Sequence, residues 1–272
     1  MSHPIARRLQ SADPDERRAA CLAAAEDPSG TLLAEELADA LGDPVKAVVR
    51  AASDALVQIA RRAGGVDEAI REALHSQVPS RRWGAAFTWA RLEPPGPRVL
   101  PALVEALGSP DGDVRWAAAR LLVEAGRLHA DVLPLLLGLV RGGEHALVRR
   151  MATFALRELA PDRPEAAQVL LDATDDVDLR VRRAAYTAMA SLMSPPPQVA
   201  EHLLRTLESD PDAATRRLAA LALGEIGASE PQALPPHAEG ALRQAGGRSE
   251  DPDLRRAIER ALTRLRAGSP VP

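Results

Sequence analysis

The 272-residue chain is poor in cysteine, lysine and aromatic residues. Cys21 is its only cysteine, which excludes a disulfide framework and a metal cluster built from cysteines. Lys46 is its only lysine, so nearly all positive charge is carried by arginine, which can form bidentate pairs with carboxylates and phosphates. Aromatic residues make up 2% of the chain, so we expect a thin core in which Ala and Leu let the helices approach closely.

Further absences narrow the function. No apolar run is long enough to span a bilayer, and the first ten residues lack the apolar stretch of a secretory signal, so we expect a cytoplasmic protein without membrane contact. The net charge of −4 gives no overall bias toward nucleic acid. The sequence contains no H-E-x-x-H, no G-x-S-x-G, no phosphate-binding loop and no Cys–His arrangement. We therefore expect no catalytic residue, no cofactor and no metal site.

What the sequence does contain is a repeat. The stretch 109–126, SPDGDVRWAAARLLVEAG, has relatives along the whole chain. Five of them begin with Asp or Ser before Pro, a pattern that opens a helix: Asp13, Asp43, Ser109, Asp210 and Asp251. Each continues with an Arg, followed in nearly all of them by a small residue three positions later. The leading arginines are Arg17, Arg50, Arg81, Arg115, Arg149, Arg182, Arg216 and Arg255. Spacings of 31 to 39 residues indicate a solenoid of stacked repeats.

Each of these helices follows a shorter apolar segment that has helical spacing, as in Leu33, Leu37 and Leu41. The predicted first helices are 4–10, 31–41, 66–75, 98–107, 131–140, 164–173, 197–208 and 235–244. No segment alternates with the period of a strand. We predict an all-α fold, an α-solenoid of eight helix pairs in one right-handed superhelix over residues 1–267, with layers about 9 Å apart. A longer loop at 228–237 precedes the last pair, and residues 268–272 are predicted to be a flexible tail.

The repeat resembles the HEAT repeat, and most closely its short bacterial form found in phycobilisome-lyase-type proteins. The pattern D-P-x-x-V-R-x-A-A at the start of the second helix carries the resemblance, which extends over nearly the whole chain. Its clearest matches are 113–118, 181–185 and 215–220. The resemblance implies a fold and says little of function, because such repeats serve many unrelated tasks.

We phase the second helices by placing the leading Arg at position zero and rotating about 100° per residue. Positions −1, +3, +7 and +10 then share a side that we predict is buried. Positions +1, +5 and +8 lie opposite, on the side that is concave in a HEAT-like stack. Row +1 contains Arg18, Ala51, Arg82, Trp116, Arg150, Arg183, Arg217 and Arg256. Row +5 contains Leu22, Ala55, Ala86, Arg120, Phe154, Thr187, Leu221 and Arg260. Row +8 contains Ala25, Gln58, Trp89, Val123, Arg157, Ala190, Gly224 and Thr263.

These three rows form the candidate binding face. They contain no Asp or Glu although the chain is acidic overall, and they hold three of its six aromatic residues. Exposed Trp flanked by Arg is typical of a binding hot spot. The alternative is that these arginines are solvated or pair with acids of neighbouring loops, and that the aromatic rings pack against their stems. The candidate partner-binding residues are Arg82, Trp89, Trp116, Arg120, Arg150, Phe154, Arg157 and Arg183.

Other residues receive structural predictions. The arginines at position zero should bond to aspartates in the turns, for which Asp43, Asp176 and Asp210 are available. Trp83, at +2, should pack against a neighbouring repeat. Acid collects on the first helices, as at 35–39 and 67–72, and predicts a negative outer surface beside a positive concave face.

Three functions remain open. We expect a monomeric scaffold whose concave face holds an acidic or amphipathic segment of a protein partner. The first alternative is nucleic-acid binding, because HEAT-like alkylpurine DNA glycosylases also combine Arg and aromatic residues on the concave face. The net charge and the lack of a nearby concave carboxylate disfavour it. The second alternative, an enzyme subunit of the bilin-lyase type, is implied only by the resemblance to that repeat subtype.

Overall fold

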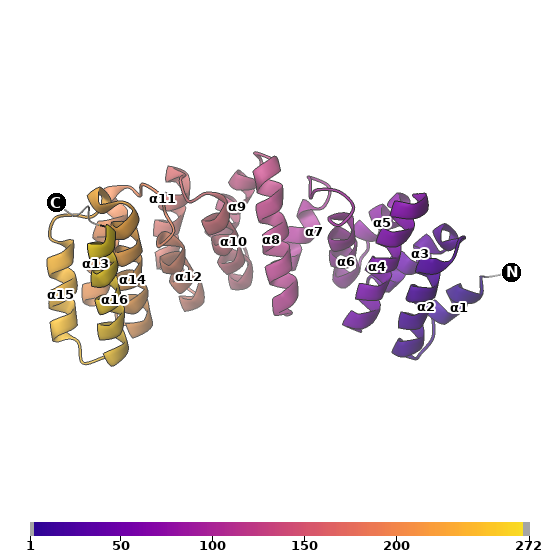
Figure 1. The fold of residues 1–272 in the computed structure, drawn as a ribbon, viewed down its shortest axis with the longest axis horizontal. Coiled ribbons are helices and arrows are strands. Elements are labelled where there is room, and N and C mark those ends of the chain that lie inside the picture. The colour runs from indigo at the N-terminus through magenta and orange to yellow at the C-terminus, as the bar shows by residue number, and fades with distance from the viewer. Residues whose placement is uncertain (1–2, 269–272) are drawn as a thin grey trace. The chain divides into compact units, whose positions relative to one another are not determined.

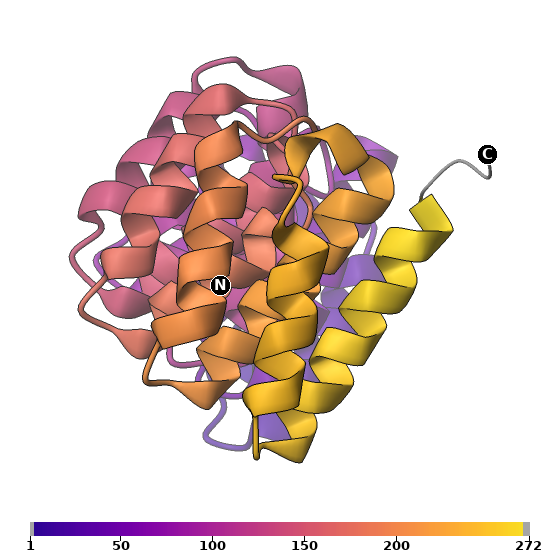
Figure 2. The same ribbon diagram turned by 90° about the vertical axis from the view of Figure 1, so that its left-hand side faces the viewer.

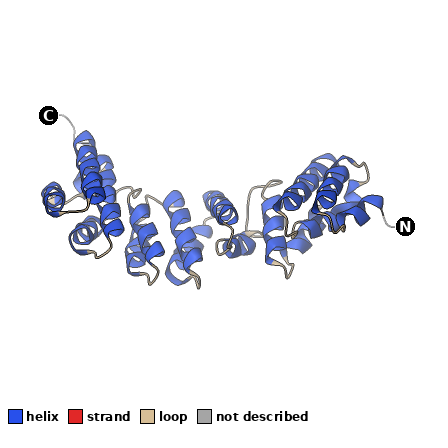
Figure 3. Cartoon of the chain, turned by 90° about the horizontal axis from the view of Figure 1, so that it is seen from below, coloured by secondary structure: helices blue, strands red, loops and turns tan. Residues whose placement is uncertain are grey.

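The computed structural model describes residues 3–268, which form helices joined by short loops and contain no strand (Figure 3). The chain divides into two compact units, Met1–His129 and Ala130–Pro272. Figure 1 shows the helices of each unit as successive antiparallel pairs. The described residues thus contain the eight helix pairs that the repeat predicts.

In the N-terminal unit the α-helices are α1 (Pro4–Leu9), α2 (Pro14–Glu26), α3 (Ala34–Ala40), α4 (Lys46–Ala63), α5 (Asp67–Leu74), α6 (Pro79–Trp89), α7 (Leu100–Ala106) and α8 (Gly112–Leu128). In the C-terminal unit they are α9 (Val132–Gly142), α10 (Ala146–Leu159), α11 (Pro164–Asp172), α12 (Leu179–Met189), α13 (Pro197–Ser209), α14 (Ala213–Ser229), α15 (Ala238–Arg248) and α16 (Pro252–Gly268). Short 3₁₀ helices are η1 (Gly30–Leu33), η2 (Ala173–Asp175) and η3 (Pro231–Ala233). The last lies in the longer loop that the sequence predicts before the final pair.

Within each unit the helices form two layers. The even-numbered helices pack on one another in sequence, as α2, α4 and α6 do in the first unit and α10, α12, α14 and α16 in the second. The odd-numbered helices form the other layer. Figure 2 shows the last pair, α15 and α16, side by side at the C-terminal end. Leucine and alanine fill the space between the layers, with fully buried side chains such as Leu37, Leu56, Leu122 and Leu156. Each unit is therefore an α-solenoid, as predicted.

Aspartates start several of the second helices. The side chains of Asp13, Asp111, Asp178 and Asp212 accept hydrogen bonds from backbone N–H groups in the first turn of the helix that follows. Such capping satisfies donors that have no partner inside the helix. At Asp13, the proline that follows occupies the first helical position, as the sequence predicts.

At three other turns the predicted helix start is two residues early. Ser109, Asp43 and Asp210 precede a proline, but helices α8, α4 and α14 are capped two positions after them. Their side chains instead accept the N–H of the residue two positions on, at 3.2, 2.8 and 2.8 Å respectively. This arrangement is a turn closed by a polar side chain, and it lies just before the helix.

The acidic segments 35–39 and 67–72 lie on α3 and α5 of the odd-numbered layer, and Glu35, Asp39, Asp67, Glu68 and Glu72 are exposed. Of the predicted tail at 268–272, Gly268 is the last residue of α16 and the others lie outside the described residues. The right-handed superhelix and the single body over residues 1–267 stay predictions.

Candidate functional site

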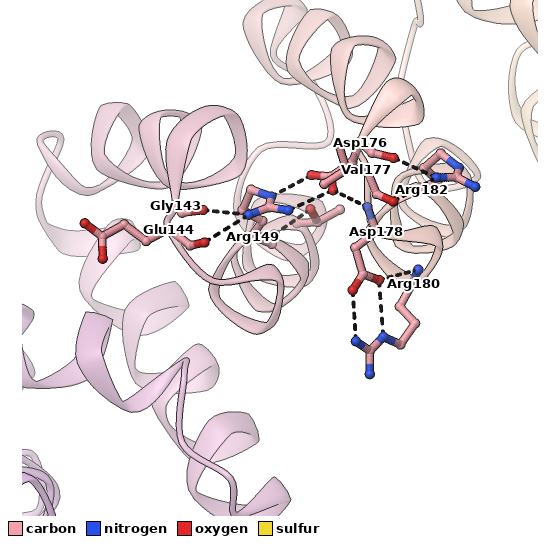
Figure 4. A network of polar contacts seen from close by, with 9 residues as sticks. Gly143, Glu144, Arg149, Asp176, Val177, Asp178, Arg180 and Arg182 are labelled. Atoms are coloured by element: carbon pink, nitrogen blue, oxygen red, sulfur yellow. Dashed lines mark hydrogen bonds and ion pairs between the residues drawn. The ribbon is translucent and has the colours of Figure 1, made fainter.

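An arginine closes the turn within each of several repeats, and Arg149 shows how (Figure 4). Its Nη1 donates to the carbonyl oxygen of Gly143 at 2.8 Å, six residues earlier in the same repeat. Its Nε and Nη2 donate to the two carboxylate oxygens of Asp176, at 2.6 and 2.9 Å, in the turn of the next repeat. The guanidinium lowers the pKa of Asp176 by these hydrogen bonds. One side chain therefore links two consecutive repeats.

The bond to the carbonyl six residues earlier defines the equivalent position of every repeat, which we call the anchor position. It is made by Arg17, Arg82, Arg115, Arg149, Arg182 and Arg216. Counting six residues from Asp43 and Ser249, which hold equivalent turn positions, gives Val49 and Arg255 for the other two repeats. Successive anchors are then 32 to 34 residues apart, except for a last step of 39.

The predicted Arg–Asp ladder is confirmed at two of the three aspartates. Arg17 donates to Asp43 at 2.6 and 3.1 Å, and Arg149 to Asp176 as described. Asp210 differs. Its carboxylate accepts a hydrogen bond from the backbone N–H of Asp212, and its backbone carbonyl accepts one from Nη1 of Arg216. The side chain of Asp210 thus shapes its own turn.

The anchor positions correct the register predicted for the second and third repeats by one residue. There the zero positions are Val49 and Arg82, and the predicted Arg50 and Arg81 are wrong. Row +1 becomes Arg18, Arg50, Trp83, Trp116, Arg150, Arg183, Arg217 and Arg256. Row +5 becomes Leu22, Asp54, Phe87, Arg120, Phe154, Thr187, Leu221 and Arg260. All of these side chains are exposed or half-buried.

The prediction that row +8 is exposed is also wrong for part of the row, although Thr263 is exposed. Val123 is 8% exposed and Gly224 is buried. A Cβ on Gly224 would lie 2.6 Å from the Cα of Ala261 in α16, so this row faces the next even-numbered helix. Rotation about a single helix axis shows which side faces the first helix of the same repeat. It does not show which side faces the second helix of the next repeat. The third exposed row is +9, with Glu26, Gln58, Arg91, Glu124, Glu158, Ser191, Glu225 and Arg264.

This row changes the expected electrostatics. Glu26, Glu124, Glu158 and Glu225 stand in it, and Asp54 stands in the corrected row +5. The prediction that the face lacks acid is therefore wrong for the face as a whole. It holds for row +1 alone, which consists of six arginines and two tryptophans.

Two candidate residues are not on the exposed face. Trp89 is only 7% exposed, lies seven positions after the anchor in a core row, and has the guanidinium of Arg98 4.7 Å from its ring centroid. Arg82 is the anchor of its repeat, and its Nε donates to Glu105 of α7 at 2.8 Å. Both side chains therefore make structural contacts, and the prediction that they stand in the exposed rows +8 and +1 is wrong.

Two aromatic residues that the sequence analysis missed take their place. Trp83 and Phe87 stand at +1 and +5 of α6, with ring centroids 5.6 Å apart, and Arg91 lies 5.9 Å from the Phe87 ring. Trp83 is half-buried and stands at +1, the row of Trp116, so its predicted position at +2 is wrong, while its packing against a neighbouring repeat stays a prediction. The missed signal is the polar turn residue Ser76, which precedes the true anchor by six positions as Ser109 does in the next repeat.

Trp116 and Arg120 are exposed as predicted. Trp116 is 48% exposed on α8, and Arg120 follows one turn later. Together with Arg50, Trp83 and Phe87 they occupy rows +1 and +5 of α4, α6 and α8, all within the N-terminal unit. We call these five residues the aromatic surface. It places large apolar rings between two arginines, Arg50 and Arg120, that form no ion pair with a carboxylate among residues 3–268.

The remaining candidates belong to the C-terminal unit. The guanidinium of Arg150 lies 5.7 Å from the ring centroid of Phe154, both half-buried on α10. Nε of Arg157 lies 3.4 Å from Oε1 of the neighbouring Glu158. Arg183 donates to both carboxylate oxygens of Asp212, at 2.9 and 2.7 Å. Of these, Arg183 follows the alternative in which row +1 arginines pair with the acids of the next loop.

The described residues bear on the expected absence of a metal site and a reactive thiol. They contain no group of three or more His, Cys, Asp and Glu side chains arranged to hold a metal ion. Cys21 is fully buried, and burial raises the pKa of its thiol to about 12, which suppresses the reactive thiolate. The hydroxyl of Tyr186 lies within hydrogen-bond distance of half-buried His202 and of buried Thr206, and desolvation lowers the pKa of His202. Within the same part of the chain, no helix combines the length and apolarity that crossing a membrane needs.

A family comparison decides the identity of the repeat. The model of HEAT repeats matches residues 66–157 and 133–224, which together exceed half of the chain. The chain is a HEAT-repeat protein. The matched range begins at the third repeat and ends in the seventh, so HEAT repeats include all the helices of the aromatic surface except α4. No curated protein matches the chain in sequence.

Solved structures agree on the HEAT-repeat fold. The Escherichia coli protein YibA matches with a TM-score of 0.56 and 19% identity, over 96% of this chain and 91% of that one. A mutant of Kap121p matches with a TM-score of 0.61 and 14% identity, over 96% of this chain. The chain spans 33% of the length of Kap121p. At these identities the similarity concerns the fold alone.

Proposed function

We propose that this HEAT-repeat protein is a non-enzymatic, monomeric binding scaffold of the cytoplasm. Its aromatic surface holds an acidic or amphipathic segment of a protein partner. The observation that carries the proposal is Trp116, 48% exposed in a row otherwise made of arginine and one further tryptophan. A large exposed apolar ring lowers solubility and contributes little to folding, so contact with a partner is the reason to keep it there.

The charges around the rings support an acidic segment. Arg50 and Arg120 flank Trp83, Phe87 and Trp116, and a guanidinium can bind a carboxylate through two parallel hydrogen bonds. A partner helix with apolar residues at i, i+3 or i+4 and acids beside them would place its anchors on the rings and its charges on the arginines. Row +1 of the C-terminal unit is less suited to bind an acidic segment, because Arg183 and Arg217 already form ion pairs with Asp212 and Asp253.

The positions of the acids also bear on the nucleic-acid alternative. A strand of nucleic acid needs a groove of positive charge that follows many consecutive phosphates. In the N-terminal unit the rows beside the arginines contain Glu26, Asp54 and Glu124, which would repel phosphates. A short acidic protein segment that contacts only Arg50 and Arg120 avoids this repulsion.

The experiment begins with capture of proteins from an extract of the source cell on wild-type protein, Trp116→Ala and Leu32→Ala. Leu32 is a matched control, because it is 77% exposed but lies in η1, away from the aromatic surface. A partner bound at this surface is retained by wild type and Leu32→Ala and lost by Trp116→Ala. Peptides tiling that partner, labelled with fluorescein, then give affinities by polarisation.

A labelled oligothymidylate is titrated in parallel. The proposal predicts that an acidic peptide binds and that the oligonucleotide does not bind between about 50 and 200 mM salt. Tight, strongly salt-dependent binding of the oligonucleotide, with no peptide bound, would replace the proposal by the nucleic-acid alternative. Retention of every partner by Trp116→Ala would move the binding site away from the aromatic surface.

A further inference from the structure

The only lysine of the chain joins two helices that are not neighbours in sequence. Lys46 is the first residue of α4, and its Nζ lies 2.5 Å from Oδ2 of Asp111 and 3.4 Å from Oδ2 of Asp113. Asp111 caps α8, and Asp113 lies in the first turn of that helix. The bridge therefore runs from the second repeat to the fourth. The third repeat, with α5 and α6, lies between them in the stack (Figure 1).

The bridge lies beside the aromatic surface. On α4, Lys46 precedes Arg50 by four residues, and on α8, Asp113 precedes Trp116 by three, so each pair shares a helix face. The exposed faces of α4 and α8 thus meet at the N-terminal ends of these helices. Helix α6, which carries Trp83 and Phe87, is the even-numbered helix between them. The relative positions of Arg50, Phe87 and Trp116 depend on how far apart α4 and α8 are held.

Within the described residues, the second and third repeats lack the link from an anchor arginine to an aspartate in the turn of the next repeat. Two anchor arginines, Arg17 and Arg149, donate to an aspartate in the next turn, Asp43 and Asp176 respectively. In the second repeat the anchor is Val49, which cannot donate a hydrogen bond, and the turns before α6 and α8 have Ser76 and Ser109 where the ladder has aspartate. The anchor of the third repeat, Arg82, instead pairs with Glu105 of α7, in the first helix of the fourth repeat.

We propose that Lys46 is a positioning residue, which ties α4 to α8 across the third repeat and so holds the aromatic surface in the shape that binds a partner. This inference rests on the proposed function. The ion pair raises the pKa of Lys46 and lowers that of Asp111, so the bridge stays charged throughout the neutral range. Lys46 is 58% exposed, and an exposed pair contributes little free energy, so it adjusts the spacing of helices that other contacts already fold.

The test measures the separation of α4 and α8 without any partner. Nitroxide spin labels are placed on Gln58→Cys and Glu124→Cys, two exposed positions in row +9 of these helices that are not part of the aromatic surface. The native Cys21 is fully buried and remains unlabelled. Pulsed electron paramagnetic resonance on the full chain then gives the distribution of distances. The variants are Lys46→Gln, Lys46→Arg, and the double variant Asp111→Asn with Asp113→Asn, in which asparagine still caps α8.

We expect a narrow distribution in the labelled parent, a broadened or displaced one in Lys46→Gln and in the Asn double variant, and recovery in Lys46→Arg. If the distance distribution of Lys46→Gln is the same as that of the labelled parent, the positioning role is overturned. With a peptide in hand, Lys46→Gln should weaken binding by about fivefold and Lys46→Arg by less than about twofold. Unchanged peptide affinity in Lys46→Gln would also overturn the inference.

The two proposals fail in different ways. If the distances respond to Lys46 but no peptide or protein binds any variant at the aromatic surface, the tie between α4 and α8 holds and the proposed function is wrong. If peptides bind through Trp116 while the distances and affinities ignore Lys46, the function holds and the positioning role is wrong.

Discussion

Arg183 and Asp212 join the sixth and seventh repeats through two hydrogen bonds, at 2.9 Å from Nε and 2.7 Å from Nη2. The same carboxylate accepts the backbone N–H of Thr215 at 2.9 Å and so caps α14. One aspartate therefore serves the start of its own helix and the link to the preceding repeat. Arg183, followed by the hydrogen bonds from Thr215, lowers the pKa of Asp212 far below its ordinary value of 3.8.

This pair predicts an acid-sensitive contribution to stability. Because the folded-state pKa of Asp212 is depressed, its contribution is present above the ordinary pKa of 3.8 and is lost as the pH falls below that value. Asp212→Ala should lower the free energy of unfolding by about 1 to 2 kcal/mol at pH 7, the usual effect of losing a helix cap. Asp212→Asn keeps the cap and should lose less. Urea titrations at neutral and at acidic pH measure both effects, and an equal loss at both would contradict the linkage.

The three tryptophans should respond differently to truncation. Trp116→Ala should leave thermal unfolding nearly unchanged and weaken partner binding by ~2 kcal/mol, about thirtyfold. Trp89→Ala should reduce stability by about 3 to 5 kcal/mol, because it removes a ring that is 7% exposed from the core. Trp83→Ala should weaken binding and also reduce stability, since the residue is half-buried against Phe87. Calorimetry and peptide titration on the same preparations separate the two readouts, and a stable Trp89→Ala would refute the corrected register.

Gly224 and Gly240 form a matched pair for the close approach of α14 and α16. Both lie inside helices, but a Cβ on Gly224 would be 2.6 Å from the backbone of Ala261, whereas nothing lies within 4 Å of one on Gly240. Gly224→Ala should therefore destabilise the protein by about 1 to 3 kcal/mol. Gly240→Ala should stabilise it by about 0.5 to 1 kcal/mol, because alanine is the better helix former. Thermal unfolding of both variants measures these changes. Stabilisation by both substitutions would show that α14 and α16 can move apart at little cost.

Cys21 should be inert in the folded protein. Burial raises the pKa of its thiol to about 12, so almost no thiolate exists at pH 7 to 8. A thiol-specific reagent should react with one group only after denaturant unfolds the chain. The rate of reaction across a urea titration should follow the unfolding transition, and rapid labelling without denaturant would contradict full burial.

The helix pairs could be predicted because nearly every repeat combines a polar turn, a leading arginine and apolar residues at helical spacing. These features act within one repeat and so are visible in the sequence. The rotation of each helix was harder to predict. The double arginine 81–82 offers two possible anchors, and only the contact between Arg82 and the carbonyl of Ser76 selects one of them. That one-residue error exchanged the roles of Trp83 and Trp89.

The burial of Val123 and Gly224 in row +8 could not be predicted from single helices at all. It depends on how near the next even-numbered helix lies, as Gly224 against Ala261 shows. The same reason hides the partners of row +1. Arg183 and Arg150 stand at equivalent positions in the sequence, yet one meets an aspartate of the next turn and the other an aromatic ring of its own helix. Lys46 is visible in the sequence as the only lysine. Its partners, Asp111 and Asp113, could not be predicted, because they lie 65 and 67 positions away and no other repeat of the described residues has an equivalent pair.

The hydrogen bond from an anchor arginine to the carbonyl six residues earlier has a consequence for biosynthesis. Arg17, Arg115 and Arg216 each complete this bond within a single turn of their own repeat, so it needs no residue that is translated later. Such short-range closure carries a small entropic cost and forms early. In a nascent chain, the start of such a second helix can therefore form before the following repeat has been synthesised. The turns of an incomplete chain need no residue of a later repeat to close.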